Sequence, residues 1–371
     1  MWIASLLAAI MLAYANGAND NFKGVATLLG SGTTNYRRAL FWACSTTLAG
    51  SIAAAWVAQE LLDTFSGRGL VPDAIASAPA FSASVGLAAA ATVLLATYLG
   101  LPISTTHALT GALVGAGLIH AANEVAFSHL GTAFVAPLLF SPLLAMICAA
   151  GIYLIFRACR LALGVDKESY LCVGREIIRS ELLPATGERL FKPLPALQPQ
   201  IDSDQSCQQS YLGNFLGIPI GKALDLLHYL SAGAVGFARG LNDTPKIAAL
   251  LVVSSTLTPA ARYELVALFI ALGGWLSARR VAETLSHKVT AMNPGQGFSA
   301  NLVTAFLVII ASRLGMPVST THVSVGALFG IGVLSDSANK RVIASIVCSW
   351  VGTLPLAAVL AAILCWALMV P

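Results

Sequence analysis

Two short polar motifs, each present twice, hold the residues of this 371-residue chain that could bind or move a charged ligand. The motif Gly-x-Asn-Asp, followed by a lysine three residues later, occupies residues 17–23 and 240–246. The motif Pro-x-Ser-Thr-Thr-His occupies residues 102–107 and 317–322. The chain therefore contains an internal duplication, and each copy combines a carboxylate with a run of hydroxyl groups.

The first motif places one carboxylate per copy in strongly apolar sequence. A carboxylate at bilayer depth costs at least about 2.5–3.5 kcal/mol, so it needs a cation, a proton or a basic partner. Lys23 and Lys246 lie one helical turn downstream and can supply that partner. The alternative is that each Asp only caps a helix and pairs with its Lys. We predict a coupling-ion site, with sodium as a candidate ion at the two aspartates, formed by Asn19, Asp20, Asn242 and Asp243.

The same motif is expected to interrupt a helix. Gly17 and Gly240 permit an unwound backbone, and Asn and Asp are favourable helix N-caps. Pro245 suits the first turn of a new helix. Each copy is therefore expected to contain a break between two half-helices.

The second motif has the composition of an oxyanion site. Its proline stops one helix, and a helix that begins just after it offers free N–H groups and roughly half a positive charge. Hydroxyl groups add neutral donors. The alternative is that they bond back to the carbonyl four residues earlier, as is common in membrane helices. The predicted anion-binding residues are Ser104, Thr105, Thr106, Ser319, Thr320 and Thr321.

Three further polar residues accompany this motif. His107 and His322 could carry protons, because imidazole titrates near neutral pH, or they could be hydrogen-bonded packing residues. Packing is the more common role. Arg313, four residues before Pro317, is either a charge near the anion or a side chain that reaches a cavity.

The composition makes the bilayer the solvent of this chain. Hydrophobic residues make up 57% and charged residues 10%, against roughly 45–50% and 25% in soluble proteins. Several apolar stretches reach the roughly 20 residues of a spanning helix. No basic, aromatic-rich tract indicates nucleic-acid binding, and residues 217–222 lack the spacing and hydroxyl of a phosphate-binding loop. The sequence thus predicts an all-α integral membrane protein that is not an enzyme and needs no cofactor.

The seven cysteines are scattered without a Cys-x-x-Cys pair. This spacing argues against a metal knuckle and against a disulfide framework. We therefore expect them to be packing residues.

A change of character near residue 157 divides the chain. Residues 157–219 mix basic and acidic residues with prolines and a Gln/Asp/Ser-rich run, which is typical of a solvated linker. The predicted organisation is a first transmembrane repeat at 1–156, a linker at 157–219 and a second repeat at 220–371. By the positive-inside rule the linker is cytoplasmic.

The remaining basic residues favour inverted repeats. If each hydroxyl motif lies at the tip of a re-entrant hairpin, each half crosses the membrane an odd number of times and the halves have opposite orientations. A parallel arrangement would instead move the linker or an arginine pair outside. In the inverted topology only Arg68 and Arg262 are clearly outside, and the cytoplasmic set outside the linker is Arg37, Arg38, Arg279, Arg280, Lys288, Lys340 and Arg341.

Together the four motifs and the intervening loop resemble the inorganic phosphate transporter family. The likeness covers about residues 10–125 and 230–340. It implies symport of phosphate with sodium or protons, usually by a homodimer, with the two motif aspartates essential for transport. Leu241 stands where a small residue is more usual, and Asn301 stands near a place where many members have Glu or Gln, so the coupling ion stays open.

The resulting prediction is a multi-pass symporter that imports inorganic phosphate across the plasma membrane, the inner membrane if the source is bacterial. Some members of the family carry sulfate. A protonated phosphate can donate a hydrogen bond to a carboxylate, whereas sulfate at neutral pH cannot, so the aspartates favour phosphate. An anion channel and a membrane enzyme acting on a phosphorylated lipid are the remaining alternatives.

Overall fold

The computed structural model describes residues 2–121, 124–166, 168–174, 177–182, 189–193, 197–211, 215–254, 256–288 and 292–369. It divides into two compact units. One unit combines Met1–Ile152 with His228–Pro371, and the other is Tyr153–Leu227. Of the linker's basic residues, Lys167 and Arg175 lie outside the described residues.

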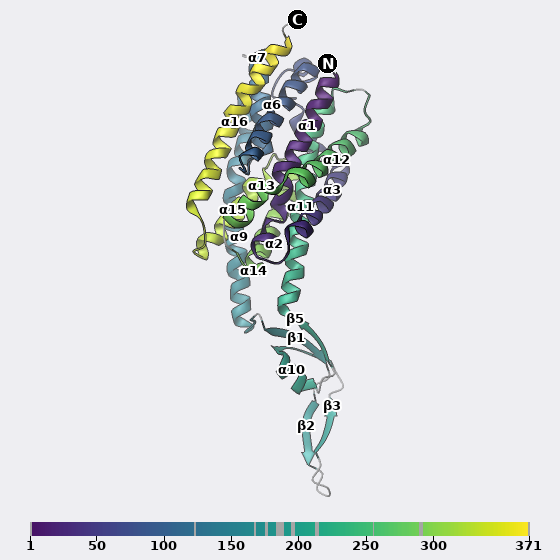
Figure 1. The fold of residues 1–371 in the computed structure, drawn as a ribbon, viewed down its shortest axis with the longest axis vertical. Coiled ribbons are helices and arrows are strands. Elements are labelled where there is room, and N and C mark those ends of the chain that lie inside the picture. Colours follow the sequence, from purple (N-terminus) through teal and green to yellow (C-terminus); the bar gives the residue numbers. More distant parts are fainter. Residues whose placement is uncertain are drawn as a thin grey trace. The chain divides into compact units, whose positions relative to one another are not determined.

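The first copy consists of helices joined by short loops and turns (Figure 1). Its long helices are α1 (Trp2–Asp20), α3 (Tyr36–Val57), α6 (Pro79–Tyr98), α7 (Thr105–Ala121) and α9 (Ala136–Ala162). Shorter elements connect them: a 3₁₀ turn (Asn21–Gly24), α2 (Ala26–Gly30), α4 (Gln59–Phe65), α5 (Asp73–Ala76), α8 (Phe127–His129) and a π turn (Leu130–Val135).

The second copy repeats the order of long helices. These are α11 (Ile220–Ala248), α12 (Pro259–Ser277), α14 (Pro294–Arg313), α15 (Thr320–Leu334) and α16 (Lys340–Met369). Between them lie a 3₁₀ turn (Ala249–Leu251), α13 (Arg279–Glu283) and a π turn (Thr284–Lys288).

Seven described helical segments are long and apolar enough to cross a membrane, which confirms the predicted membrane protein. They are Trp2–Gly24, Tyr36–Val57, Pro79–Tyr98, Phe127–Ala162, Pro259–Ser277, Pro294–Arg313 and Lys340–Leu368.

Each hydroxyl motif lies at the tip of a helical hairpin, as predicted. α6 and α7 form the first hairpin, and α14 and α15 form the second. Gly100 (φ +70°) and Gly315 (φ +66°) end the first helix of each hairpin in the left-handed conformation that glycine tolerates best. The N–H of Leu101 bonds to Ala96 O and the N–H of Met316 bonds to Ala311 O, both at 2.9 Å, so each helix end is closed in the same way.

The helix break is present in the first copy only. α1 ends at Asp20, where a 3₁₀ turn begins. In the second copy α11 continues through Asn242 and Asp243 with Pro245 inside it, and a 3₁₀ turn begins only at Ala249. The predicted break at the second motif was therefore wrong. Pro245 was a misleading signal, because a proline removes one helical hydrogen bond without always ending the helix.

The motif glycines serve close helix packing. A Cβ added at Gly17 would overlap the carbonyl oxygen of Ile270 on α12. A Cβ at Gly240 would overlap that of Thr47 on α3 in the same way. In both copies the glycine therefore permits the motif helix to touch a helix of the other copy, rather than to unwind as we had expected.

The last helix of each copy also packs on the hairpin of the other. Gly111 of α7 touches the backbone of Leu354 on α16, and Gly326 of α15 touches the backbone of Pro142 on α9. The two copies thus exchange equivalent contacts.

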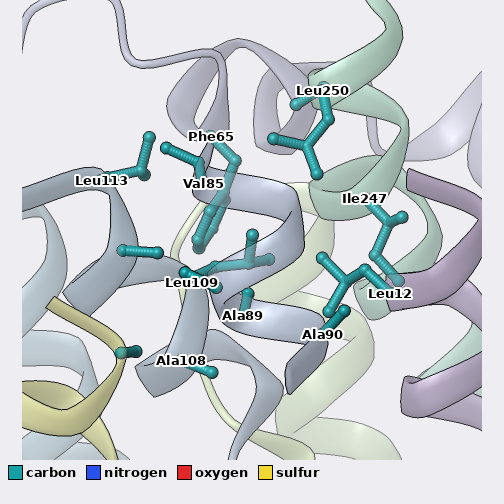
Figure 2. Close-up of a cluster of buried hydrophobic side chains, with 14 of the residues drawn as sticks. Leu12, Phe65, Val85, Ala89, Ala90, Ala108, Leu109, Leu113, Ile247 and Leu250 are labelled. Atoms are coloured by element: carbon teal, nitrogen blue, oxygen red, sulfur yellow. The ribbon is translucent and has the colours of Figure 1, made fainter. Parts of the chain in front are cut away.

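The main hydrophobic core joins the two copies. Figure 2 shows Ile247 of the second copy beside Leu12 of α1, and Leu250 of the second copy and Ala90 of α6 belong to the same cluster. Because both copies contribute to this core, neither buries its apolar faces alone.

Residues 153–227 form a unit with strands, where the sequence predicted only a solvated linker. β4 (Gln198–Ser203), β1 (Ser169–Gly174) and β5 (Phe215–Pro219) form one antiparallel sheet in that order. β2 (Ile177–Leu182) pairs with β3 (Arg189–Pro193), and α10 (Asp204–Tyr211) follows β4.

A disulfide bond joins Cys172 of β1 to Cys207 of α10. The expectation that all cysteines are unpaired packing residues was therefore wrong for this pair. Their separation of 35 residues gives no spacing signal, and only the sheet brings β1 next to α10.

Candidate functional site

The two hairpin tips touch each other through their threonines. Thr106 donates a hydrogen bond to the carbonyl of Val318 (3.2 Å), and Thr321 donates one to the carbonyl of Ile103 (2.9 Å). Each hydroxyl thus reaches the backbone of the opposite tip. Because each threonine is at most 2% exposed, the contact between the two copies is buried.

Two buried lysines bridge these tips. Lys23 donates to the carbonyl of Ile103 (2.7 Å) and to the hydroxyl of Thr321, and it forms an ion pair with Asp20. Its ammonium therefore connects the first motif to both hairpins.

Lys246 makes the matching contacts in the second copy. It donates to the hydroxyl of Thr106 and to the carbonyl of Val318, both at 2.7 Å. Its ammonium lies 3.6 Å from a carboxylate oxygen of Asp243. The pairing of each Asp with its Lys, one of the two predicted roles, is therefore present in both copies.

The motif asparagines hold the hairpin loops in place. Asn19 donates to the carbonyl of Leu101 (3.0 Å) and accepts from the N–H of Ile103 (3.1 Å). Asn242 donates to the carbonyl of Val318 (3.2 Å) and accepts from Ser312 (3.2 Å). They fix the tips and do not cap helices.

Arg239 is a site residue that the sequence analysis missed. Fully buried, it donates to the side-chain oxygens of Asn16 (2.6 Å) and Asn21 (2.9 Å), and its Nε lies 3.6 Å from Asp243. Asn16 in turn donates to both Asp20 and Asp243 (3.1 Å each). Arg239 and Asn16 each stand three residues before the motif asparagine, so aligning the two copies would have revealed them as a pair.

Five buried charged side chains around the two hairpin tips form a cluster whose charges do not cancel. Three cations face two carboxylates, and all five side chains are at most 4% exposed. With every group ionised, the formal charge is +1. The members of the cluster are Asp20, Lys23, Arg239, Asp243 and Lys246.

The remaining motif hydroxyls have different roles. Ser104 accepts from the N–H of His107 (3.1 Å) and Ser319 accepts from the N–H of His322 (3.3 Å), so both serines cap helices. Thr105 donates to Asp20 (3.1 Å). Thr320, at the matching position, is buried in the first turn of α15. The N-termini of α7 and α15 thus meet beside the charged cluster.

A family model described as "Phosphate transporter family" matches residues 16–361, which include all four motifs. The chain belongs to the phosphate transporter family. The resemblance seen in the sequence is thereby confirmed.

Sequence matches to two relatives cover nearly the whole length of this chain. It is 26% identical to a putative phosphate permease of Thermococcus kodakarensis, covering 99% of this chain and 98% of the relative. It is 27% identical to the chloroplastic inorganic phosphate transporter 2-1 of Arabidopsis thaliana, and the match covers 98% of this chain and 71% of the relative. A solved structure titled "The sodium-dependent phosphate transporter" has the same fold, with a TM-score of 0.73 and 22% sequence identity. The match covers 99% of this chain and 98% of that one.

Membership of this family agrees with the prediction that the chain is a transporter and not an enzyme. It also agrees with the predicted multi-pass membrane location. Within the described residues, no group of three or more His, Cys, Asp and Glu side chains has the arrangement to hold a metal ion.

The motif histidines of this phosphate transporter family member are packed against each other. Their ring centroids lie 4.4 Å apart in an edge-to-face arrangement. Nδ1 of His107 lies 3.2 Å from the carbonyl of Trp350, and Nδ1 of His322 lies 3.3 Å from that of Leu138. These contacts favour the packing role. Arg313 is exposed and does not join the buried charges.

An open cavity of about 680 Å³ lies beside the first motif. Tyr36 in its wall stacks on Phe22, the neighbour of Lys23, with ring centroids 5.2 Å apart. Three arginines and one glutamate give the lining a net positive charge, which concentrates anions near the mouth of the cavity. Its lining residues are Leu29, Asn35, Tyr36, Arg37, Arg38, Arg279 and Glu283.

Proposed function

We propose that this chain imports inorganic phosphate by secondary active symport. The observation that carries the proposal is the buried cluster with a formal charge of +1 between two hydroxyl-bearing helix N-termini. An anion placed there gains charge neutralisation, neutral hydroxyl donors and two helix dipoles together. Membership of the phosphate transporter family makes phosphate the anion that we expect.

Phosphate rather than sulfate fits the carboxylates of the site. Asp20 lies within hydrogen-bond distance of Thr105, so an anion at this hydroxyl lies next to a carboxylate. A protonated phosphate can donate to such a carboxylate, whereas sulfate at neutral pH has no proton to donate. A sulfate permease of the same family remains the second candidate.

Alternating access would follow from the division of the site between the copies. The contacts between the tips, from Thr106 to Val318 and from Thr321 to Ile103, are the bonds that must break when one copy rocks against the other. The exchanged contacts of Gly111 and Gly326 indicate that the two copies pack as equivalent partners. With inverted repeats, as proposed from the basic residues, such rocking would open the site to each side in turn.

The proposed coupling ion is sodium or a proton, with Asn19, Asp20, Asn242 and Asp243 as the coupling residues. A homodimer in the plasma membrane is part of the same proposal.

The test is uptake of radiolabelled phosphate into proteoliposomes under an imposed sodium or proton gradient. We expect accumulation above the external concentration, which a channel cannot produce, and we expect excess sulfate to leave it unchanged. Asp20→Asn should reduce uptake to background while the protein still inserts. Uptake abolished by sulfate would make the chain a sulfate transporter, and normal uptake by Asp20→Asn would contradict the proposed site.

A further inference from the structure

The ammonium group of Lys23 lies among oxygen atoms of the kinds that bind hard cations. These are a carboxylate oxygen of Asp20, the hydroxyl of Thr321 and the carbonyl of Ile103 at 2.7 Å. Carboxylate, hydroxyl and carbonyl oxygens at broken helices are the ligands that transporters offer to sodium. In this chain an amino group of the protein occupies that position.

Lys246 occupies the same kind of position in the second copy. Its ammonium contacts the hydroxyl of Thr106 and the carbonyl of Val318, with Asp243 at 3.6 Å. In both copies the carboxylate and the carbonyl come from the lysine's own copy, and the hydroxyl comes from the other. The duplication therefore produced two equivalent cation positions, each filled by a lysine.

A sodium ion does not fit beside these lysines. It would have to displace an ammonium whose side chain is at most 4% exposed. It would also add charge to a cluster that already carries a formal +1 and includes Arg239, 3.6 Å from Asp243. A further cation among these buried cations would be repelled strongly, because the medium there has a low dielectric constant.

We propose that Lys23 and Lys246 are tethered cations that replace bound sodium at the two cation positions of the transport site. The inference rests on the proposed phosphate transport and decides its coupling ion. The lysines neutralise the anion, the aspartates hold the lysines in place, and the proton is the coupling ion.

The first test measures sodium binding without transport. Purified wild-type protein in detergent is titrated with ²²Na⁺ in a scintillation proximity assay, with choline as the competing inert cation. We expect no saturable binding. Saturable ²²Na⁺ binding by the wild-type protein would overturn the proposal, whatever anion the protein carries.

The second test measures phosphate uptake into proteoliposomes under an inward proton gradient, in sodium medium and in choline medium. We expect equal rates in the two media. Lys23→Met and Lys246→Met remove the charge without adding an oxygen ligand, and each should lower uptake at least about tenfold, which corresponds to about 1.4 kcal/mol. Uptake that requires sodium would overturn the proposal.

Lys23→Asn and Lys246→Asn supply a neutral oxygen where the ammonium was. We expect the double variant to bind ²²Na⁺ and to take up phosphate only in sodium medium. Lys340→Asn, at an exposed position at the start of α16, is the matched control and should behave as wild type. Full sodium-independent uptake by the double variant would contradict the role of the lysines.

The outcomes separate this inference from the proposed function. If no gradient drives phosphate uptake by the wild-type protein, the proposed function fails, and the ²²Na⁺ titration still decides the inference. If phosphate uptake occurs but needs sodium, the function stands and the inference fails.

Discussion

At the scale of single residues, the cluster between the hairpin tips is ordered by Arg239. Its guanidinium contacts Asn16, Asn21 and Thr47, and it also pairs with Asp243. A planar group carries five donors on three nitrogens, so it can reach acceptors that lie farther apart than those around the single nitrogen of an ammonium. Arg239 therefore holds the end of α1 and the 3₁₀ turn after it in place, and it adds a third cation to a cluster that has two carboxylates.

Replacing Arg239 should destabilise the protein and abolish transport. Arg239→Met leaves Asp243 with a weakened set of partners, and removing one member of a buried ion pair costs about 3–5 kcal/mol. Arg239→Lys should recover little, because it cannot contact Asn16 and Asn21 together. Thermal unfolding in detergent measures the effect. Arg341→Met, at an exposed position, is the control, and an equal melting temperature for Arg239→Met would contradict this role.

At the scale of helices, glycine contacts hold each hairpin against the last helix of the other copy. A Cβ at Gly115 would overlap the carbonyl oxygen of Ala358 on α16. A Cβ at Gly330 would overlap that of Met146 on α9. Because these contacts involve backbone atoms, a side-chain rotation cannot relieve the overlap.

Gly115→Ala and Gly330→Ala should therefore destabilise the protein by similar amounts. Overpacking of this kind typically costs about 1–3 kcal/mol. Gly352→Ala is the matched control on α16, because nothing lies within 4 Å of its added Cβ. It should be neutral or slightly stabilising. Thermal unfolding compares the three variants, and a loss of stability for Gly115→Ala alone would argue against equivalent contacts in the two copies.

At the scale of the whole molecule, two features of the residues between the copies indicate different compartments. By the positive-inside rule, the basic residues near the ends of the helices predict a cytoplasmic position for residues 157–219. The Cys172–Cys207 bond is typical of an oxidising compartment, because cytosolic thiols are kept reduced. The charge signal comes from many residues in both copies, whereas the disulfide is a single bond. We therefore expect residues 157–219 on the cytoplasmic side, with Cys172 and Cys207 reduced in the cell.

Cys159 reports which side these residues occupy, because it is an exposed free thiol in α9. A membrane-impermeant maleimide added to intact cells should not label it, and permeabilised cells should be labelled. Cys159→Ser gives the background from the other cysteines. Labelling of intact cells above that background would place the unit outside and would make the disulfide the expected state in the cell.

The membrane class, the duplication, the hairpin tips and the pairing of each Asp with a Lys can be predicted without the fold. These are local or repeated signals: apolar stretches, a motif present twice, a glycine and a proline that end a helix, and residues three apart. They depend on neighbours along the chain, so they can be read without the fold.

The way in which the two copies contact each other could not be predicted from the sequence. Thr106 and Thr321 bond to backbone carbonyls of the opposite tip, and Arg239 reaches Asn16 from 223 residues away. The pairing of Cys172 with Cys207 and the continuation of α11 through Asp243 also became clear only from the structure. These features depend on which atoms of distant segments come within hydrogen-bonding or packing distance, and no local pattern encodes that distance.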